Sequence, residues 1–270
     1  MKYLYLIALG GLNDIFCRIE KYIKYCRENN RLLFIDTRYG TYRYNILRYL
    51  IIKDNNVIQN INYFKNIDIN KLSFYPNEIK YIFDDIINKK FIKQNNKNNL
   101  IFRGQKLNED VIVCCESGGG DSFDFFYKHV FIKNKIKDYI KEKAKLIKVP
   151  YIAIHIRNTD IVTDYKKIYL TNKNLIHKYS LVYVATDNKN VISYFKNKNL
   201  NVKNFTQFPK LKHKNLHSSN LSCETKFKNL FTDMYMILKA DKVILESQGG
   251  FANLLKICYK YKDKIIPKLK

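Results

Sequence analysis

The peptide at residues 155–160 (HIRNTD) places a histidine, an arginine and a carboxylate at the end of an apolar run. His155 and Arg157 are two residues apart, so in an extended strand both point to the same face. Arginine offers fixed, paired N–H donors that suit a diphosphate. A histidine can hydrogen-bond a base or a phosphate, and Asp160 can orient the arginine. A salt bridge beside a buried histidine is the alternative, but the clustering favours a site for a phosphate-bearing ligand.

Two other apolar runs end in paired glycines that a helical pattern follows, at residues 8–14 (ALGGLND) and 246–252 (ESQGGFA). Glycine lets the backbone approach a ligand closely, and the free N–H groups of a helix start attract phosphate oxygens. An ordinary capped turn is the alternative at both places. The first turn lacks the G-x-G-x-x-G fingerprint, so no NAD site is predicted. The candidate ligand-binding residues are Gly10, Gly11 and Asn13 in the first turn, and Ser247, Gly249 and Gly250 in the second.

A lone carboxylate, Asp187, follows the buried run at residues 181–186 (LVYVAT). It can accept hydrogen bonds from a base or from ribose hydroxyls. It can equally cap the helix that the pattern predicts over residues 189–198. The sequence leaves both roles open.

The elements that would position these residues alternate between strands and helices, which predicts an α/β fold with parallel sheets. Strands are predicted at 3–9, 31–36, 110–115, 151–157, 181–186, 201–206 and 242–246. Helices are predicted over about 15–26, 123–148, 189–198, 226–240 and 250–261, and residues 41–100 are expected to hold two helices and irregular chain. Pro150 marks a domain boundary between Rossmann-like domains at 1–148 and 149–270. Ligands of such sheets bind beyond the carboxyl ends of the strands, so we expect the site in the crevice between the domains.

The composition is that of a globular protein with an unusual charge. The chain has 270 residues, of which 46% are hydrophobic, and a formal net charge of +25. The charge favours anionic partners, although heavy use of Lys, Asn, Ile and Tyr is also what an AT-rich coding sequence produces. The six cysteines have no zinc-site spacing and are expected to be reduced thiols of a cytoplasmic protein. No run reaches the roughly 20 apolar residues of a membrane span, so any contact with an anionic membrane is expected to be peripheral, through lysines.

Taken together, these peptides resemble the fucosyltransferase-like superfamily of GT-B glycosyltransferases, which includes core and protein-O-fucosyltransferases and bacterial relatives. Its Gly-Gly-x-Asn loop is matched by Gly10, Gly11 and Asn13, and its His-x-Arg-x-x-Asp peptide by residues 155–160. Its late helix and Ser-x-x-x-Phe turn are similar to residues 231–241 and 247–251. Residues 40–110 add nothing to the resemblance.

The resemblance implies a GT-B-like fold and an inverting, metal-independent transfer of fucose or a related sugar from a GDP-sugar to a glycan or lipid-linked acceptor. No cofactor is implied. The donor would bind the C-terminal domain and the acceptor the N-terminal one. Arg157 would contact the diphosphate, His155 and Asp187 would approach the nucleoside, and Ser247 would contact phosphate. Asn158 stands where the family commonly has a second basic residue, and Gly249-Gly250-Phe251 where many members have Ser-Phe-Ser, so the sugar stays open.

The chemistry also needs an anion-stabilising group and a base. Arg157, supported by Asp160, would stabilise the leaving diphosphate together with helix N-termini. The chain has no Asp-x-Asp peptide for a manganese-bound donor. Candidates for the base that activates the acceptor hydroxyl are Asp14, Glu116 and Asp121, in glycine-rich loops of the first domain. Asp14 is the first choice because its loop should face the crevice.

Three alternatives remain open. A nucleic-acid-binding protein would explain the charge and the many tyrosines, but the basic residues are spread evenly and no nucleic-acid motif is present, so no nucleic-acid partner is expected. A sulfotransferase-like enzyme would need a lysine pattern after the first strand that is missing here. A catalytically inactive nucleotide-sugar-binding domain on the same fold is the third.

Overall fold

The computed structural model describes residues 1–40, 42–60, 62–88, 100, 102–210, 216 and 219–270. The chain forms two compact units, Met1–Phe131 and Ile132–Lys270. The predicted boundary at residues 148/149 lies beyond helix α4 (Asn134–Ala144), which packs against α7 (Cys223–Lys239) within the second unit. No helix in the described part of the chain has both the length and the apolar character needed to span a membrane.

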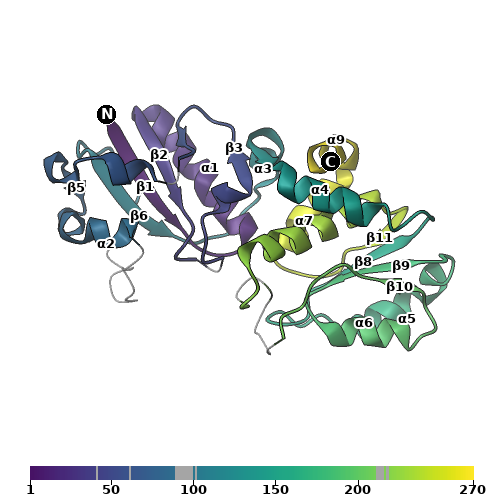
Figure 1. Ribbon diagram of the computed structural model, residues 1–270. Helices are drawn as coiled ribbons and strands as arrows, with labels where there is room; N and C mark the ends of the chain where they lie inside the picture. Colours follow the sequence, from purple (N-terminus) through teal and green to yellow (C-terminus); the bar gives the residue numbers. More distant parts are fainter. Residues whose placement is uncertain (41, 61, 89–99, 101, 211–215, 217–218) are drawn as a thin grey trace. The chain divides into compact units, whose positions relative to one another are not determined.

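The first unit is built on a five-stranded parallel sheet in the order β4-β2-β1-β6-β5 (Figure 1). The strands are β1 (Lys2–Ala8), β2 (Arg31–Asp36), β4 (Val57–Ile58), β5 (Phe74–Tyr75) and β6 (Val111–Glu116). In the register, Tyr3 lies beside Leu32 on one side and Val111 on the other. The strands predicted at residues 3–9, 31–36 and 110–115 are thus confirmed as the three central strands.

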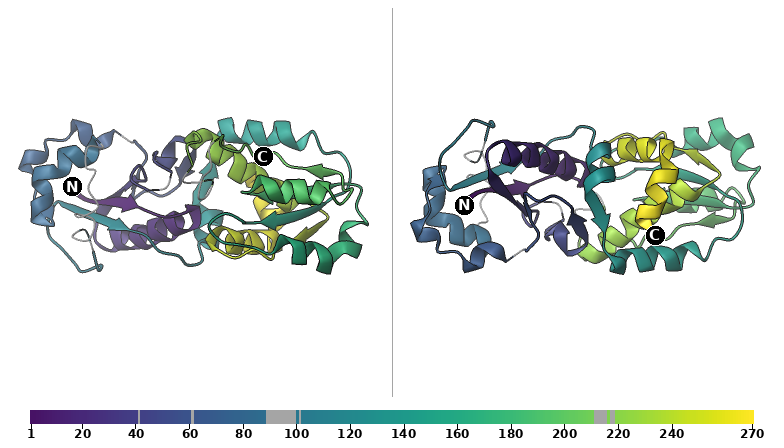
Figure 2. Two further views of the ribbon diagram at one scale, coloured as in Figure 1. Left: turned by 90° about the horizontal axis from the view of Figure 1, so that it is seen from below. Right: turned by 90° about the horizontal axis from the view of Figure 1, so that it is seen from above.

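Both faces of this sheet are buried, which is why β1 is apolar at nearly every position. Tyr3, Tyr5 and Ile7 pack with aromatic residues such as Phe64 and Phe83 from later segments. Alternate residues of β1 point to the other face. That face is covered by helix α1 (Leu12–Glu28), which runs along β1 and β2 (Figures 1 and 2).

The segment expected to hold two helices, residues 41–100, is mostly short elements where the structure describes it. It contains β3 (Leu50–Ile52), β4, β5, four 3-10 segments and one short α-helix, α2 (Phe83–Ile87). The 3-10 segments are Ile46–Arg48, Tyr63–Asn66, Ile69–Lys71 and Asn77–Ile82. Phe64, Phe74 and Phe83 in these elements bury against the sheet, but the buried residues do not form a continuous helical stripe.

The single helix predicted over residues 123–148 is wrong. The chain forms α3 (Phe123–His129), strand β7 (Val130–Ile132) and then α4. The apolar spacing shows the break in retrospect, because Val130 and Ile136 are six residues apart, which no helical face accommodates. Strand β7 pairs with β3 in a two-stranded sheet.

The second unit holds a four-stranded parallel sheet in the order β10-β9-β8-β11. The strands are β8 (Ile152–Ile156), β9 (Val182–Thr186), β10 (Val202–Lys203) and β11 (Lys242–Ile244). The helices beside α4 and α7 are α5 (Tyr165–Ile176), α6 (Lys189–Lys196), α8 (Gly250–Lys260) and α9 (Lys262–Leu269). In Figure 1, α4 and α7 lie on one side of this sheet and α5 and α6 on the other.

Two of these helices were missed by sequence reasoning. Helix α5 is the crossover that parallel strands β8 and β9 require, but Lys and Asn dilute its apolar face. Helix α9 packs on α7 and α8 near the C-terminus (Figure 2). Its internal Pro267 hid the helical pattern.

A buried carboxyl joins α7 to the sheet of the second unit. Asp233 accepts hydrogen bonds from the hydroxyls of Tyr183 (2.5 Å) and Thr206 (2.9 Å). Burial raises the pKa of Asp233 from 3.8 to about 7, although both hydrogen bonds oppose that change. The carboxyl therefore binds its proton more tightly in the folded chain than in the unfolded one.

We predict that Asp233 makes the folded state lose stability as pH rises. Below pH 4 the carboxyl is protonated in both states; between about pH 4 and 7 the unfolded chain releases the proton first, which favours unfolding. Asp233→Asn removes this effect. The rise of the Asp233 pKa to about 7 corresponds to roughly 4 kcal/mol. By pH 8 the free energy of unfolding of the variant should therefore exceed that of wild type by an amount of this order.

Urea unfolding at pH 4.5, 6 and 8 measures the effect. The matched control is Asp138→Asn on α4, where the carboxyl is mostly exposed. Equal pH profiles for wild type and Asp233→Asn would contradict the prediction.

Candidate functional site

The sheet of the second unit has its topological switch point between β8 and β11. From β8 the chain proceeds through α5 to β9 and on to β10, whereas β11 pairs with the opposite side of β8. Loops leaving two such strands diverge, and ligands of open α/β sheets bind in the space beyond their carboxyl ends. The loops here are residues 157–164 and 245–249. They contain three of the predicted donor-binding residues, Arg157, Ser247 and Gly249, and His155 and Gly250 lie close beside them.

Arg157 and Asp160 form a bidentate ion pair at this point. Arg157 Nε donates to Asp160 Oδ1 (2.9 Å) and Nη2 donates to Oδ2 (2.7 Å). The side chains of Arg157 and Asp160 are 22% and 18% exposed, so the pair lies at the surface of the loop and not in the core. Two parallel bonds fix the plane of the guanidinium. Asp160 therefore fixes the orientation of Arg157, and the predicted role of the pair in catalysis stays a prediction.

The hydroxyl of Ser247 ties the ends of β8 and β11 together. It accepts the backbone N–H of Arg157 (3.0 Å) and donates to the carbonyl of His155 (2.9 Å). Ser247 is 1% exposed. Its hydroxyl thus holds the strand that carries His155 and Arg157, and its predicted contact with phosphate stays a prediction.

Asp187, at the end of β9, folds the loop that follows Arg157. Its carboxylate accepts the N–H of Asn158 (2.7 Å) and the hydroxyl of Thr159 (2.6 Å). Burial raises the pKa of Asp187, while these hydrogen bonds and the charge of Arg157 oppose the rise. The alternative role as a helix cap is wrong, because the adjacent Asn188 caps α6.

His155 is buried beside this cluster as a neutral imidazole. Burial, together with the charges of Arg157 and Lys256, lowers the pKa of His155 to about 4. Its ring meets Phe251 edge-on, with centroids 6.0 Å apart. The ring atom Nδ1 is buried and has no hydrogen-bond partner in the described part of the chain. A buried polar atom of this kind is costly unless a ligand or water satisfies it.

Gly249 leaves room for the guanidinium of Arg157. It has a φ of +108°, and a Cβ at this residue would lie 2.5 Å from Arg157 Nη1. Gly249 is also the cap of α8, which begins at Gly250. The positive end of a helix and a guanidinium therefore converge. Two positive groups with one carboxylate beside them favour an added anion at the same place.

The first unit has an equivalent switch point between β1 and β6, where the turn at Gly10-Gly11 meets the loop at residues 117–121. Asn13 links them, since its amide donates to the carbonyl of Gly120 (3.0 Å) and its oxygen accepts from Ser122 (2.8 Å). Asn13 is thus committed to joining two loops. Its predicted contact with a ligand is untested.

Asp14 caps helix α1. Its carboxylate accepts the N–H of Gly11 (3.0 Å) and lies where a Cβ on Gly10 would clash, at 2.8 Å. Gly10 has a φ of +97°, so a side chain there is disfavoured on both counts. Gly10 therefore makes space for a carboxylate at the carboxyl edge of β1, whereas a Cβ on Gly11 would lie 3.6 Å from Asp14 Oδ2, an ordinary contact distance.

The other two candidate bases are engaged by cations or by backbone. Glu116 accepts from Lys21 (2.9 Å), Arg18 (3.3 Å) and the hydroxyl of Tyr22. Burial raises the pKa of Glu116, but these hydrogen bonds and charges outweigh it, so the pKa is lowered overall and the group is a weak base. Asp121 accepts the N–H of Phe123 (2.8 Å) at the start of α3.

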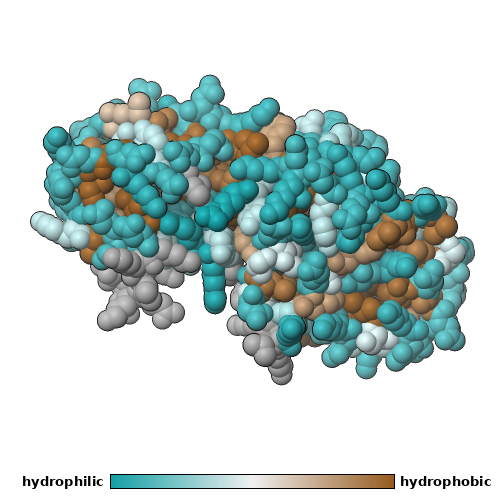
Figure 3. All heavy atoms as spheres, viewed as in Figure 1, coloured by the Kyte–Doolittle hydropathy of each residue, from teal (hydrophilic) through white to brown (hydrophobic). Residues whose placement is uncertain are grey.

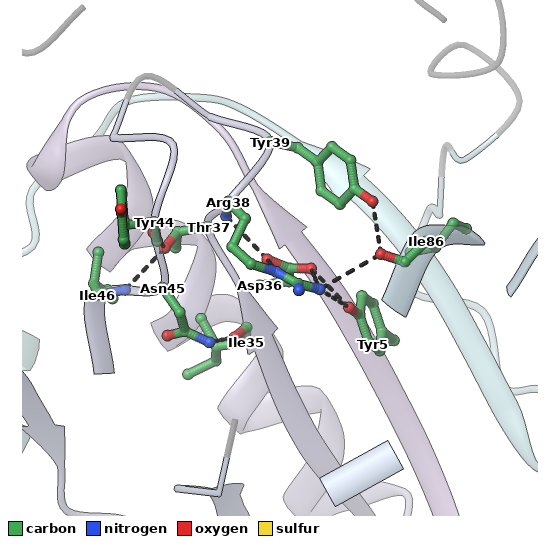
Figure 4. A network of polar contacts seen from close by, with 10 residues as sticks. All are labelled: Tyr5, Ile35, Asp36, Thr37, Arg38, Tyr39, Tyr44, Asn45, Ile46 and Ile86. Carbon is green, nitrogen blue, oxygen red and sulfur yellow. Dashed lines mark hydrogen bonds and ion pairs between the residues drawn. The ribbon is translucent and has the colours of Figure 1, made fainter. Parts of the chain in front are cut away.

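A further polar network at the end of β2 was missed by sequence reasoning (Figure 4). Asp36 is fully buried and accepts from Arg38 Nε (2.9 Å), Arg38 Nη2 (2.7 Å) and the hydroxyl of Tyr5 (2.7 Å). Tyr39 donates to the carbonyl of Ile86 in α2 (2.6 Å). Arg38 Nη2 also donates to the carbonyl of Ile86 (3.4 Å), so this network secures the loop after β2 to α2.

The predicted residues therefore form two groups, one in each unit. His155, Arg157, Asp160, Asp187, Ser247, Gly249 and Gly250 belong to one, and Gly10, Gly11, Asn13 and Asp14 to the other. Sequence reasoning missed Thr159 as the partner of Asp187, because a contact between residues 28 apart leaves no local pattern. In the described residues, no group of three or more His, Cys, Asp or Glu side chains is arranged to hold a metal ion.

Comparison with solved structures identifies the fold. Fucosyltransferase NodZ from Bradyrhizobium matches with a TM-score of 0.58 and 14% identity, over 95% of this chain and 93% of that chain. NodZ α-1,6-fucosyltransferase soaked with GDP-fucose gives 0.59 and 14%, over 95% and 92%. The same enzyme co-crystallized with GDP gives 0.57 and 14%, over 95% and 92%. No family model and no curated protein sequence matches the chain.

The chain therefore shares the fold of these fucosyltransferases. This confirms the predicted α/β, GT-B-like fold class, and it confirms the family resemblance at the level of the fold.

We predict that Gly249→Ala displaces Arg157. The new methyl group would enter space that the guanidinium occupies, in addition to straining a backbone with positive φ. Gly104→Ala is the matched control, since Gly104 also has a positive φ (+86°) but has no atom within 4 Å of the added Cβ. Backbone strain alone costs on the order of 1–3 kcal/mol.

Thermal unfolding measures both variants. Gly249→Ala should be less stable than Gly104→Ala, and the double variant Gly249→Ala/Arg157→Ala should recover the difference. No recovery in the double variant would show that the guanidinium is not what the methyl group meets.

Proposed function

We propose that this protein transfers a sugar from a GDP-sugar donor to a glycan or lipid-linked acceptor, with inversion and without a metal ion. The observation that carries the proposal is the cluster at the β8/β11 switch point. Arg157, the N-terminus of α8 and a neutral His155 meet there. A solved structure with the same fold was soaked with GDP-fucose. The proposed transferred sugar is fucose or a related sugar.

The donor would bind the second unit through its diphosphate. Arg157 can reach phosphate oxygens from a guanidinium plane that Asp160 already fixes. The backbone N–H groups at the start of α8 add further donors. Because Gly249 and Gly250 have no side chains, a phosphate can approach these N–H groups closely. The orphan Nδ1 of His155 provides a hydrogen-bonding atom for a neutral group such as a nucleoside, because an uncharged ring adds no attraction for phosphate.

The same residues would assist departure of the diphosphate. Breaking the glycosyl–phosphate bond moves a pair of electrons onto the diphosphate oxygen, and its charge grows. A preorganised guanidinium and helix N-terminus stabilise that charge without having to reorient. This is the role that a metal ion fills in enzymes with an Asp-x-Asp peptide, which this chain lacks.

The proposed base is Asp14 in the first unit. It would take the proton of the acceptor hydroxyl as the oxygen attacks the anomeric carbon. Glu116 is less suited, since its pKa is lowered and three donors occupy it. In the part of the chain that the structure describes, the carboxylate of Asp14 accepts one hydrogen bond, from the backbone N–H of Gly11.

We predict that GDP stabilises the protein and that Arg157 is required for it. A ligand at about 100 times its dissociation constant adds about 2.7 kcal/mol of stability. Thermal shift without added metal should therefore show a clear rise with GDP and smaller ones with UDP, CDP and ADP. Arg157→Ala should abolish the rise.

Arg48→Ala is the control, because Arg48 is an exposed arginine of the first unit. It should keep the response to GDP. A larger rise with another nucleotide would preserve the fold assignment but reject a GDP-sugar, and no rise with any of the four would reject the donor site.

We predict that Asp14→Asn lowers transfer without weakening donor binding. Asparagine keeps a side-chain oxygen that can accept the N–H of Gly11, so the variant removes the base and keeps this contact at the start of α1. Loss of a general base costs about 10²–10⁴-fold in rate. GDP release from GDP-fucose, with an acceptor found by glycan screening, measures the rate, and Asp121→Asn serves as the comparison. Full activity in Asp14→Asn would exclude it as the base.

A further inference from the structure

The amino ends of the four strands of the second sheet meet at one edge, opposite the edge that holds Arg157. The register places Lys242, Ile152, Val182 and Val202 in one row across this end of the sheet. We call the chain segments that lead into this row the amino edge. They are residues 145–150, 177–181, 196–201 and 239–242.

The amino edge is strongly basic. It carries seven lysines and one acidic residue, and all seven lysines are exposed. In the described part of the chain none of the seven takes part in an ion pair. The acidic residue, Asp241, accepts the backbone N–H of Tyr151 (2.9 Å). The lysines are Lys145, Lys148, Lys178, Lys196, Lys198, Lys239 and Lys242.

The carboxyl edge of the same sheet has no such excess. Its segments, residues 157–164, 187–189, 204–210 and 245–250, carry three basic and four acidic residues. A chain-wide preference for lysine would load both edges alike. The positive charge is therefore gathered on one edge, and it is not the edge of the proposed donor site.

Two exposed apolar side chains interrupt the lysines. Leu146 is 58% exposed and Val149 is 45% exposed, and they follow Lys145 and Lys148 directly in the chain. The space-filling view also shows hydrophobic residues at the surface over the strands of the second unit, bordered by hydrophilic ones (Figure 3). Lysines interleaved with exposed apolar side chains suit a lipid surface, where the ammonium groups meet phosphates and the apolar groups enter the acyl boundary. A nucleic-acid backbone would gain little from leucine and valine.

We propose that the amino edge docks the protein on an anionic phospholipid bilayer. Each lysine near such a surface strengthens binding about fivefold, and the apolar side chains add a part that salt does not screen. In this orientation the carboxyl edge faces away from the lipid, at least the length of β8 from it, about 17 Å for five residues. Provided that the proposed function holds, the acceptor hydroxyl then belongs to an extended glycan chain and not to a lipid head group.

Co-sedimentation of the full chain with vesicles tests the docking surface. The vesicles are pure phosphatidylcholine, or phosphatidylcholine with 30% phosphatidylglycerol, at about 0.15 M salt. Two variants remove the same charge from exposed positions. The edge variant carries Lys145→Gln, Lys148→Gln and Lys178→Gln, and the control variant carries Lys65→Gln, Lys106→Gln and Lys166→Gln.

Wild type should bind the anionic vesicles and not the neutral ones. The edge variant should bind about 100-fold more weakly, from three lysines at about fivefold each, and the control variant only severalfold more weakly. Leu146→Gln keeps every lysine, so this variant should still bind the anionic vesicles at about 0.15 M salt. Raising the salt to 0.5 M should then remove a larger share of its binding than of wild-type binding.

Three outcomes would overturn the proposal. They are no binding of wild type to anionic vesicles, equal losses in the edge and control variants, and retention on duplex DNA through the edge lysines without vesicle binding. The GDP thermal shift, measured on the same samples, keeps this separate from the proposed function. The edge variant should retain the shift, and vesicle binding without any GDP shift would reject the transferase and leave the docking surface standing.

Discussion

Parallel pairing of the strands is the constraint on which the rest of this structure depends. Each strand must be followed by a crossover before the next can pair, so in each sheet all carboxyl ends share one edge. Where the chain switches from one side of the central strand to the other, beside β1 in the first unit and β8 in the second, adjacent loops part. The glycine turns and most of the candidate site residues lie at those two points.

The two switch points share a geometry and differ in charge. In the second unit a guanidinium and a helix N-terminus converge, and among the described residues Asp160 is the only carboxylate paired with Arg157. In the first unit the helix N-terminus holds the carboxylate of Asp14 instead. That difference supports the proposed division of roles, in which the second unit binds the diphosphate through positive charge and the first unit supplies the base.

The charge of +25 has a distribution that the donor site does not explain. Around Arg157 the basic and acidic residues nearly balance, whereas the opposite edge of the same sheet is lined with lysines. In the proposed function the ligand binds at the carboxyl edge, so the amino edge has no part in the chemistry. That edge is therefore free to carry charge for a surface partner without disturbing the electrostatics of the site.

The sequence alone determined the central strands, the helices α1, α6, α7 and α8, the fold class and the His155–Asp160 peptide, because buried strands, helical spacing and paired glycines are local signals. It did not determine the break between α3 and α4, the crossover α5, or the short elements of residues 41–100. Their form follows from pairing and packing with distant segments. The same holds for the site: only the tertiary structure decided that Ser247 ties β8 to β11 and that Asp187 folds the loop after Arg157. Those bonds join residues 90 and 29 positions apart, and a sequence pattern records only neighbours.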